Sequence, residues 1–186
     1  MNCKVFDNYL EEDVFQKVES YIKNITDWEV LYFANRASHN KEQFQFLHTL
    51  IEKNDIRYPK ETPIIKSLLK PLFHGGADVN VIRARVNMFI RTSSSPLEMG
   101  LHEDWDSPGP YSLLLYNEDS DGATQFKNGE KILSKRNRAI LFDATIPHQT
   151  IRQTTCLFRY NININFSING TQRLVEFNQL HETRSE

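Results

Sequence analysis

The segment from Arg159 to Phe166 limits the possible folds most, because its residues alternate strictly between polar and apolar. Successive side chains of a β-strand point to opposite faces, so this alternation predicts a strand with one polar face and one apolar face. The polar face carries Arg159, Asn161, Asn163 and Asn165, and the apolar face carries Tyr160, Ile162, Ile164 and Phe166. We expect the apolar face to pack against a layer of helices.

Three asparagines and an arginine form an unusual row for a solvent-facing strand, because asparagine is a poor strand former. Each amide can donate and accept hydrogen bonds, so such a row suits the wall of a polar cavity that binds a carboxylate or water. The alternative is an edge strand with a hydrated face, which is common in antiparallel sheets.

Strand signals dominate the chain from residue 79 onward. Short segments rich in β-formers, separated by Gly, Pro, Asn and Asp, predict strands at 79–91, 98–104, 111–117, 124–127, 130–133, 138–142, 148–152 and 157–168. Before residue 79, apolar residues at helical spacing predict helices within 11–25, 40–51 and 62–72, and a strand is expected at 28–33.

These elements predict a single domain that is mainly β with flanking helices, an α+β chain. Its expected parts are a helix-rich support region over residues 1–78, a jelly-roll (double-stranded β-helix) core over 79–168 and a C-terminal tail over 169–186. The length of 186 residues and the hydrophobic content of 39% fit one such domain.

Charge and composition disfavour several classes of partner. A formal net charge of −2 gives no basic field for nucleic acid or an anionic membrane. No apolar run is long enough for a membrane span and no secretory signal is present, so we expect a cytoplasmic protein. Cys3 and Cys156 lack metal-type spacing and are expected to be free thiols. The abundance of Asn, Ile and Lys is typical of an AT-rich bacterial or phage genome.

His102, Asp104 and the distant His148 form a candidate metal-binding set. Two imidazoles and one carboxylate can occupy one face of an octahedral Fe(II) ion and leave three positions open for a co-substrate and O₂. On a strand, His102 and Asp104 share a face and Glu103 points away. The tripeptide alone is a weak signal. It gains weight from its order, because His148 follows an apolar run and a turn, and Arg159 then opens the alternating strand.

Other histidines and acids are weaker candidates for metal binding. His39, His48, His74 and His181 show no paired spacing and are interpreted as surface or cap residues. Glu103 points to the wrong face, and Asp106 lies beyond the reach that His102 and Asp104 share. Arg83 and Arg85 share a strand face; contact with a substrate carboxylate is one interpretation of this pair, and a solvated face is the favoured one.

Residues 79–168 resemble the Fe(II)/2-oxoglutarate-dependent oxygenases, within them the prolyl-4-hydroxylase-like branch in its small bacterial or phage form. Besides the metal motif, the resemblance rests on the strand at 111–117, on a turn similar to Gly-Gly-x-Thr-x-Phe at 121–126, and on the strand at 135–143 that leads to His148. Residues 5–12 resemble the family's opening strand and first helix. The chain departs from the family pattern at Asp121, Ala123 and Leu115, with Tyr116 one position out of phase.

The resemblance implies a hydroxylase whose Fe(II) is held by His102, Asp104 and His148. It implies that Arg159 binds the far carboxylate of 2-oxoglutarate, with O₂ as the second co-substrate. Asn161, Asn163, Asn165 and Tyr111 are the further residues expected at the co-substrate. The implied substrate is a prolyl side chain, another amino acid, a peptide or a small metabolite. The presence of Asp104 argues against halogenating relatives, which leave that ligand position to a halide.

Two alternatives from other classes stay open. A nucleic-acid demethylase of the same superfamily is disfavoured by the acidic balance and by the spacing of Arg152 and Arg159, which differs by one residue from that family's arginine pair. A non-catalytic jelly-roll module with a structural metal is disfavoured because such sites are normally closed by a fourth protein ligand. No motif specifies the substrate or the oligomeric state.

Overall fold

The computed structural model describes residues 3–32, 44–73 and 78–169. Its helices are α1 (Glu12–Lys23) and α2 (Thr62–Leu69), with short 3₁₀ turns on either side of α2. Its strands are β1 (Cys3–Phe6), β2 (Glu29–Tyr32), β3 (Phe44–Glu52), β4 (Asp55–Ile56), β5 (Val79–Ile90), β6 (Tyr111–Tyr116), β7 (Ala123–Phe126), β8 (Lys131–Leu133), β9 (Arg138–Asp143), β10 (His148–Ile151) and β11 (Phe158–Ile168).

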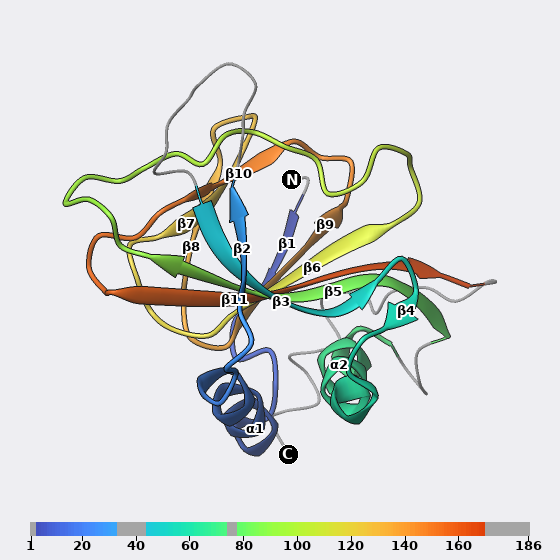
Figure 1. The fold of residues 1–186 in the computed structure, drawn as a ribbon. Coiled ribbons are helices and arrows are strands. Elements are labelled where there is room, and N and C mark those ends of the chain that lie inside the picture. Colours follow the sequence, from blue (N-terminus) through green and yellow to red (C-terminus); the bar gives the residue numbers. More distant parts are fainter. Residues whose placement is uncertain (1–2, 33–43, 74–77, 170–186) are drawn as a thin grey trace, which may run out of the picture.

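The strands form a large sheet and a small sheet with antiparallel pairing throughout. The large sheet has the order β1-β9-β6-β11-β5-β3-β2, with β4 paired to β3, and the small sheet has the order β10-β7-β8. Both helices lie on one side of the large sheet, and the small sheet lies on the other (Figure 1). The expectation of a mainly β chain with flanking helices is therefore confirmed.

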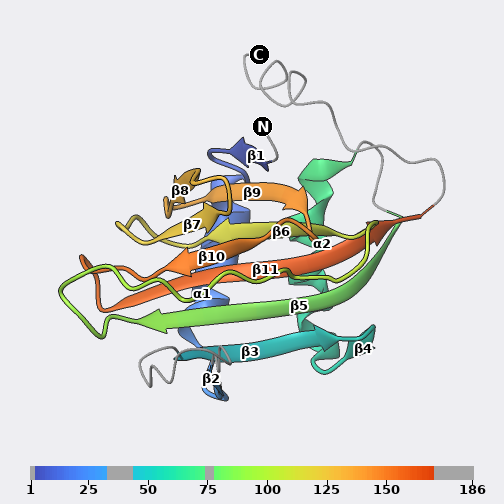
Figure 2. The same ribbon diagram turned by 90° about the horizontal axis from the view of Figure 1, so that it is seen from above.

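Strand β11 occupies the centre of the large sheet, between β5 and β6. Seen from above, β5, β3 and β2 follow one another beyond it (Figure 2). The apolar residues Ile162, Ile164 and Phe166 are buried in the core between this sheet and the helices, together with Phe15, Val18 and Ile22 of α1 and with Ile65, Leu68 and Leu69 of α2. The predicted apolar face of this strand thus packs as expected.

A second, smaller core lies between the two sheets. It is made by Cys3, Leu114, Tyr116, Phe126, Ile140 and Phe142. Strand β6 contributes to both cores, because Leu113 and Leu115 face the helices while Leu114 and Tyr116 face the small sheet. The first core joins the helices to one side of the large sheet, and the second joins the small sheet to its other side. The polar face of β11 looks into the space between the two sheets.

The helix predicted within 40–51 is wrong, because Phe44–Glu52 forms strand β3 beside β5. Residues 40–43 lie outside the described residues. Both faces of β3 are largely covered, and a β-bulge between Thr49 and Ile51 buries Leu50 and Ile51 in the same core. Apolar residues on both faces of a strand can coincide with helical spacing, so the periodicity was misleading here.

Two further predictions, on residues 1–78 and 98–104, need correction. The support region is not mainly helical, because β1 to β4 join the large sheet. The predicted strand at 98–104 consists only of two isolated bridges, Glu98 to Ile151 and His102 to His148, which attach this segment to the edge of β10.

Most of the tail, residues 170–186, lies outside the described residues. No helix among the described residues is both long and apolar enough to cross a membrane.

Candidate metal centre

His102, Asp104 and His148 converge at the edge of the small sheet. One potential ligand atom from each residue lies within 4.8 Å of the others. The pairing of His102 with His148 creates this arrangement: each backbone N–H donates to the other residue's carbonyl at 2.9 Å. The two imidazole centroids are consequently 4.5 Å apart. Asp104 then follows on the same side, with its backbone N–H donating to the carbonyl of Ala144 at 3.0 Å.

Both imidazoles are oriented through their Nδ1 atoms. The Nδ1 of His148 lies 2.9 Å from the carbonyl oxygen of Ile146, and that of His102 lies 3.3 Å from the carbonyl oxygen of Gly100. A carbonyl oxygen only accepts hydrogen bonds, so Nδ1 carries the proton and Nε2 presents its lone pair. Burial lowers the pKa of His148 against the attraction of Asp104. This favours the neutral form, which binds metals.

The Asp104 carboxylate receives hydrogen bonds from three strands of the large sheet. The donors are Arg83 Nη2 at 2.7 Å, Ser112 Oγ at 2.6 Å, Asn163 Nδ2 at 3.1 Å and Asn165 Nδ2 at 3.3 Å. Burial alone raises the pKa of this carboxyl, but electrostatic attraction by His148 and Arg83 and the Ser112 hydrogen bond outweigh it and hold the pKa at about 2. Asp104 is therefore an oriented anion at neutral pH, as a ligand to a divalent cation must be.

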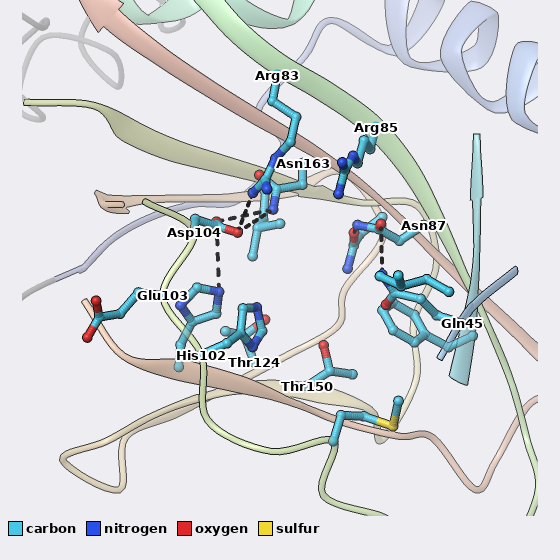
Figure 3. Close-up of a pocket in the computed structure, with 16 residues that line it drawn as sticks. Gln45, Arg83, Arg85, Asn87, His102, Glu103, Asp104, Thr124, Thr150 and Asn163 are labelled. Carbon is cyan, nitrogen blue, oxygen red and sulfur yellow. Dashed lines mark hydrogen bonds and ion pairs between the residues drawn. The ribbon is translucent and has the colours of Figure 1, made fainter. Parts of the chain in front are cut away.

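The three residues open into a cavity of about 170 Å³ between the sheets. Its walls come from β2, β3, β5, β6, β7, β10 and β11 and from the segment around residue 102. Arg83, Arg85, Asn87, Gln45 and Thr124 lie around this cavity in Figure 3, whereas the carboxylate of Glu103 points away from it. Most residues that line the cavity are thus polar, and the candidate metal ligands lie at one side of it.

Arg159 is completely buried near the cavity residues Phe89 and Asn161. Its guanidinium lies over the Phe89 ring, 4.6 Å from the centroid. Within the described ranges its hydrogen bonds are both long, at 3.4 Å to Gln153 and to the carbonyl of Ile151. Its Nη1 has no partner among the described residues. Burial lowers the pKa of Arg159, yet an arginine stays protonated. A buried cation with an unused donor fits an anionic ligand.

Gly122 makes room for this arginine. A Cβ atom at position 122 would lie 2.6 Å from Nε of Arg159, closer than Cβ atoms approach other heavy atoms in proteins. Of the two glycines in the turn of the resembled family, this chain keeps the one that lies against the guanidinium. Asp121 takes the place of the other and caps Thr154 and Thr155 instead.

Solved structures share this arrangement of sheets and helices. An oxidoreductase of the 2-oxoglutarate-Fe(II) oxygenase family from Burkholderia pseudomallei superposes with a TM-score of 0.66 at 10% identity, covering 94% of this chain and 89% of that one. The chain has the fold of the Fe(II)/2-oxoglutarate oxygenases. No protein-family model matches the sequence, and no curated protein is significantly similar to it.

Two further structures with the oxygenase fold were solved with ligands. A prolyl hydroxylase from Trichoplax adhaerens, in complex with a peptide of hypoxia inducible factor, has a TM-score of 0.58 at 13% identity and covers 100% of this chain and 88% of that one. HygX from Streptomyces hygroscopicus, with nickel, 2-oxoglutarate and hygromycin B bound, has a TM-score of 0.59 at 11% identity and covers 90% and 83%.

Within this oxygenase fold, the predicted asparagines occupy different places. Asn161 and Asn163 line the cavity, and Asn163 and Asn165 donate to the Asp104 carboxylate. Asn165 also donates to Ser112 at 2.7 Å and is completely buried behind the metal candidate. Two of the three asparagines therefore support the carboxylate, and Asn161 is the one beside the expected co-substrate region.

Tyr111 is not brought to the cavity. It packs against Phe166 in the core on the helix side of the large sheet, because it shares its face of β6 with Leu113 and Leu115. The strand aromatic on the cavity side is Tyr116, whose hydroxyl donates to Thr124 Oγ1 at 2.7 Å. Tyr116 shares its face of β6 with Ser112 and Leu114, so the prediction of Tyr111 is one residue out of phase.

The favoured predictions for the Arg83–Arg85 pair and for His48 are wrong. Arg83 and Arg85 line the cavity instead of a solvated face, and Arg83 pairs with Asp104. His48 is buried on the helix side of β3, with Nε2 2.8 Å from the hydroxyl of Tyr21, so it is neither a surface residue nor part of the cavity. His39, His74 and His181 lie outside the described residues.

Proposed function

We propose that this chain is an Fe(II)- and 2-oxoglutarate-dependent dioxygenase that hydroxylates an unactivated C–H bond of a prolyl, other amino-acid or small-molecule substrate. One observation carries the proposal: a three-ligand cluster opens into the same cavity beside which the buried Arg159 has an unused donor. The shared fold supports the proposal. Fold alone is weak evidence for activity, so the residues of the site have to carry the argument.

His102, Asp104 and His148 would hold Fe(II) on one face of its coordination sphere. No fourth His, Cys, Asp or Glu joins this group among the described residues, which leaves positions for other ligands, unlike a closed structural site. With 2-oxoglutarate and O₂, the bound iron supplies the oxidising power: the co-substrate becomes succinate and CO₂, and one oxygen atom enters the substrate C–H bond.

Arg159 would receive the far carboxylate of 2-oxoglutarate. Its Nη1 donor is free among the described residues, and Gln153 and the Ile151 carbonyl keep its guanidinium in place through their long contacts. A charge-assisted bond in so buried a place both orients the co-substrate and compensates the cost of burying the cation. Asn161 and Thr124 line the cavity close by and offer further hydrogen-bonding groups.

An anaerobic titration with Fe(II) and then 2-oxoglutarate tests this proposal. We expect a visible metal-to-ligand charge-transfer band in the wild-type protein. Asp104→Ala should abolish the band because a ligand is lost, and Arg159→Ala should require at least about tenfold more 2-oxoglutarate because a charge-assisted bond is lost.

Lys60→Ala, an exposed substitution on the 3₁₀ turn before α2, is the matched control for removing a cation and should leave the titration unchanged. Bound iron without any band would contradict the proposal, and the non-catalytic metal-binding module would then be the better account.

A further inference from the structure

Arg85 is a cavity residue that the proposed co-substrate site does not use. Its side chain is 24% exposed, and its Nη2 donates to Glu52, which is not among the residues that line the cavity. Its Nε has no partner among the described residues. In Figure 3 the side chain points from β5 toward the cavity. A cation with so little of its hydrogen-bonding capacity used by the protein is suited to an anionic ligand.

Strand register separates Arg85 from Arg159. Arg85 pairs with Asn163, whose amide donates to Asp104, whereas Arg159 pairs with Phe89. Four residues along a strand span about 13 Å. Arg85 is therefore level with the candidate metal ligands, and Arg159 lies at the far end of the row. A co-substrate whose far carboxylate pairs with Arg159 runs along β11 toward the metal ligands, so both of its ends have partners and Arg85 is left for a second molecule.

Besides Glu52 and Arg83, the neighbours of Arg85 along the cavity wall are neutral and polar. Asn87 follows on the same face of β5, receives a hydrogen bond from Gln45 Nε2 at 3.4 Å and donates to Asn161 at 2.6 Å. The other cavity arginine, Arg83, is already paired with Asp104. Of the two arginines that line the cavity among the described residues, Arg83 is paired with a carboxylate of the cavity wall. Arg85 is paired with Glu52, which does not line the cavity.

The size of the cavity limits what can reach Arg85. At about 170 Å³ it is well below the roughly 300–1,000 Å³ of pockets that hold drug-sized ligands. We propose that the primary substrate is a small carboxylic acid, free amino acids included, whose carboxylate is bound by Arg85 with Asn87 and Gln45 beside it. This inference rests on the proposed function, and it places the carbons next to the carboxylate near the metal ligands.

A binding experiment that needs no turnover tests the inference. The protein is loaded with Zn(II), which has no redox chemistry, and saturated with 2-oxoglutarate. Ligand-observed NMR then screens the common L-amino acids and a set of small monocarboxylic acids, each beside its primary amide. We expect at least one acid to bind while its amide does not. Arg85→Gln should weaken that acid about tenfold or more, the effect of losing a charge-assisted hydrogen bond.

Two more variants separate binding from support of the fold. Arg85→Lys keeps a cation and should retain part of the affinity. Glu52→Gln breaks the ion pair but leaves Arg85 free, so acid binding should be equal or tighter. Equal weakening in Glu52→Gln and Arg85→Gln would show that the pair is only structural and would overturn the inference. Thermal unfolding of each variant identifies any that fails to fold, and the remaining variants then decide.

The other outcomes are also decisive. Binding of no acid, or equal binding of acids and amides, overturns the small-carboxylate assignment. A higher 2-oxoglutarate requirement in Arg85→Gln, with unchanged acid binding, assigns Arg85 to the co-substrate and overturns it as well. The charge-transfer band with Fe(II) is measured separately. Its absence together with an acid preference in the Zn(II) protein would reject the proposed oxygenase while supporting the carboxylate site.

Discussion

The position of the Arg159 side chain requires that residue 122 has no side chain. The guanidinium of Arg159 is buried against the backbone of residue 122, where only a glycine leaves enough space. The role that we propose for Arg159 therefore requires a glycine on the neighbouring turn, and substitution at residue 122 should affect co-substrate binding without touching a metal ligand.

Gly122→Ala should raise the 2-oxoglutarate concentration needed for half of the charge-transfer band by about tenfold or more, because the new methyl group displaces the Arg159 guanidinium. The cost in the free energy of unfolding should be about 1–3 kcal/mol, typical of overpacking. Fe(II) affinity should be unchanged.

Gly129→Ala is the matched control for this substitution. Gly129 has a φ of 89°, so alanine there is strained, but no atom lies within 4 Å of the added Cβ. Its co-substrate titration should equal that of the wild type. An unchanged titration in Gly122→Ala as well would contradict the proposed role of Arg159.

Glu118 makes folding stability depend on pH. Burial raises the pKa of its carboxyl to about 7, against the hydrogen bond that it accepts from the backbone N–H of Tyr160. The folded chain then binds more protons than the unfolded chain between the ordinary pKa and about 7. Its contribution to stability is present below the ordinary pKa and is lost as pH rises through about 7.

Glu118→Gln should therefore gain stability relative to the wild type between about pH 5 and about pH 8, by at most about 3 kcal/mol. Urea unfolding at both pH values measures this difference. A constant difference between the two proteins across that range would show that Glu118 titrates normally.

At the scale of elements, the connection between β10 and β11 keeps Arg159 in place. Asp121 accepts hydrogen bonds from the backbone N–H groups of Thr154 at 2.8 Å and Thr155 at 3.1 Å, and from both hydroxyls. Burial raises the pKa of Asp121, but these hydrogen bonds outweigh it and hold the pKa below its usual range. Gln153, a neighbour of Arg159, belongs to the same connection.

Asp121→Ala should lower the free energy of unfolding by about 1–3 kcal/mol, because four hydrogen bonds from Thr154 and Thr155 to a charged carboxylate are lost. It should also raise the 2-oxoglutarate requirement through the displaced connection. Chemical denaturation and the anaerobic titration measure the two effects. Asp55→Ala, an exposed change in β4, should stay within about 0.5 kcal/mol of the wild type. Equal stability of the two variants would contradict this account.

Elements with one polar face were predictable, and elements covered on both faces were not. The alternation of β11 indicated both its core side and its cavity side. Strand β3 has buried residues on both faces, so its apolar spacing matched a helix equally well. In β6 the residues from Ser112 to Tyr116 are all buried, which removes the polar face that would have set the phase and led to Tyr111 instead of Tyr116.

Contacts between distant residues had no local signal. The metal motif could be recognised from residue types and order. The pairing of Arg83 with Asp104 depends on how β5 approaches the 98–104 segment in space, and the sequence near Arg83 contains no indication of it. The same holds for the cavity wall formed by Gln45 and Asn87 from neighbouring strands.

At the scale of the whole molecule, the metal candidate joins the two sheets. His148 belongs to the small sheet and His102 is bridged to it, while the donors that hold Asp104 come from β5, β6 and β11 of the large sheet. A metal bound by all three residues would therefore tie the sheets together. Arg83 compensates the charge of Asp104 in the protein itself, so we expect folding not to require the metal.

Zn(II) at about a hundredfold excess over its Kd should stabilise the protein by about 2.7 kcal/mol, the mass-action effect of a ligand that binds only the folded state. Thermal unfolding with and without Zn(II) measures the gain, and His148→Ala should remove it. After chelation of the metal, the near-UV circular dichroism should keep its native form. Loss of that signal on chelation would mean that the chain folds only with metal.

The position of β11 also has a consequence for the order of events during translation. This strand lies between β5 and β6, yet it is the last described strand to leave the ribosome. Until it emerges, β3 with β5 and β1 with β9 and β6 are two separate half-sheets, each with an open edge. Such edges are templates for pairing with other chains. The nascent chain is therefore most in need of chaperone protection just before the strand that carries Arg159 is synthesised.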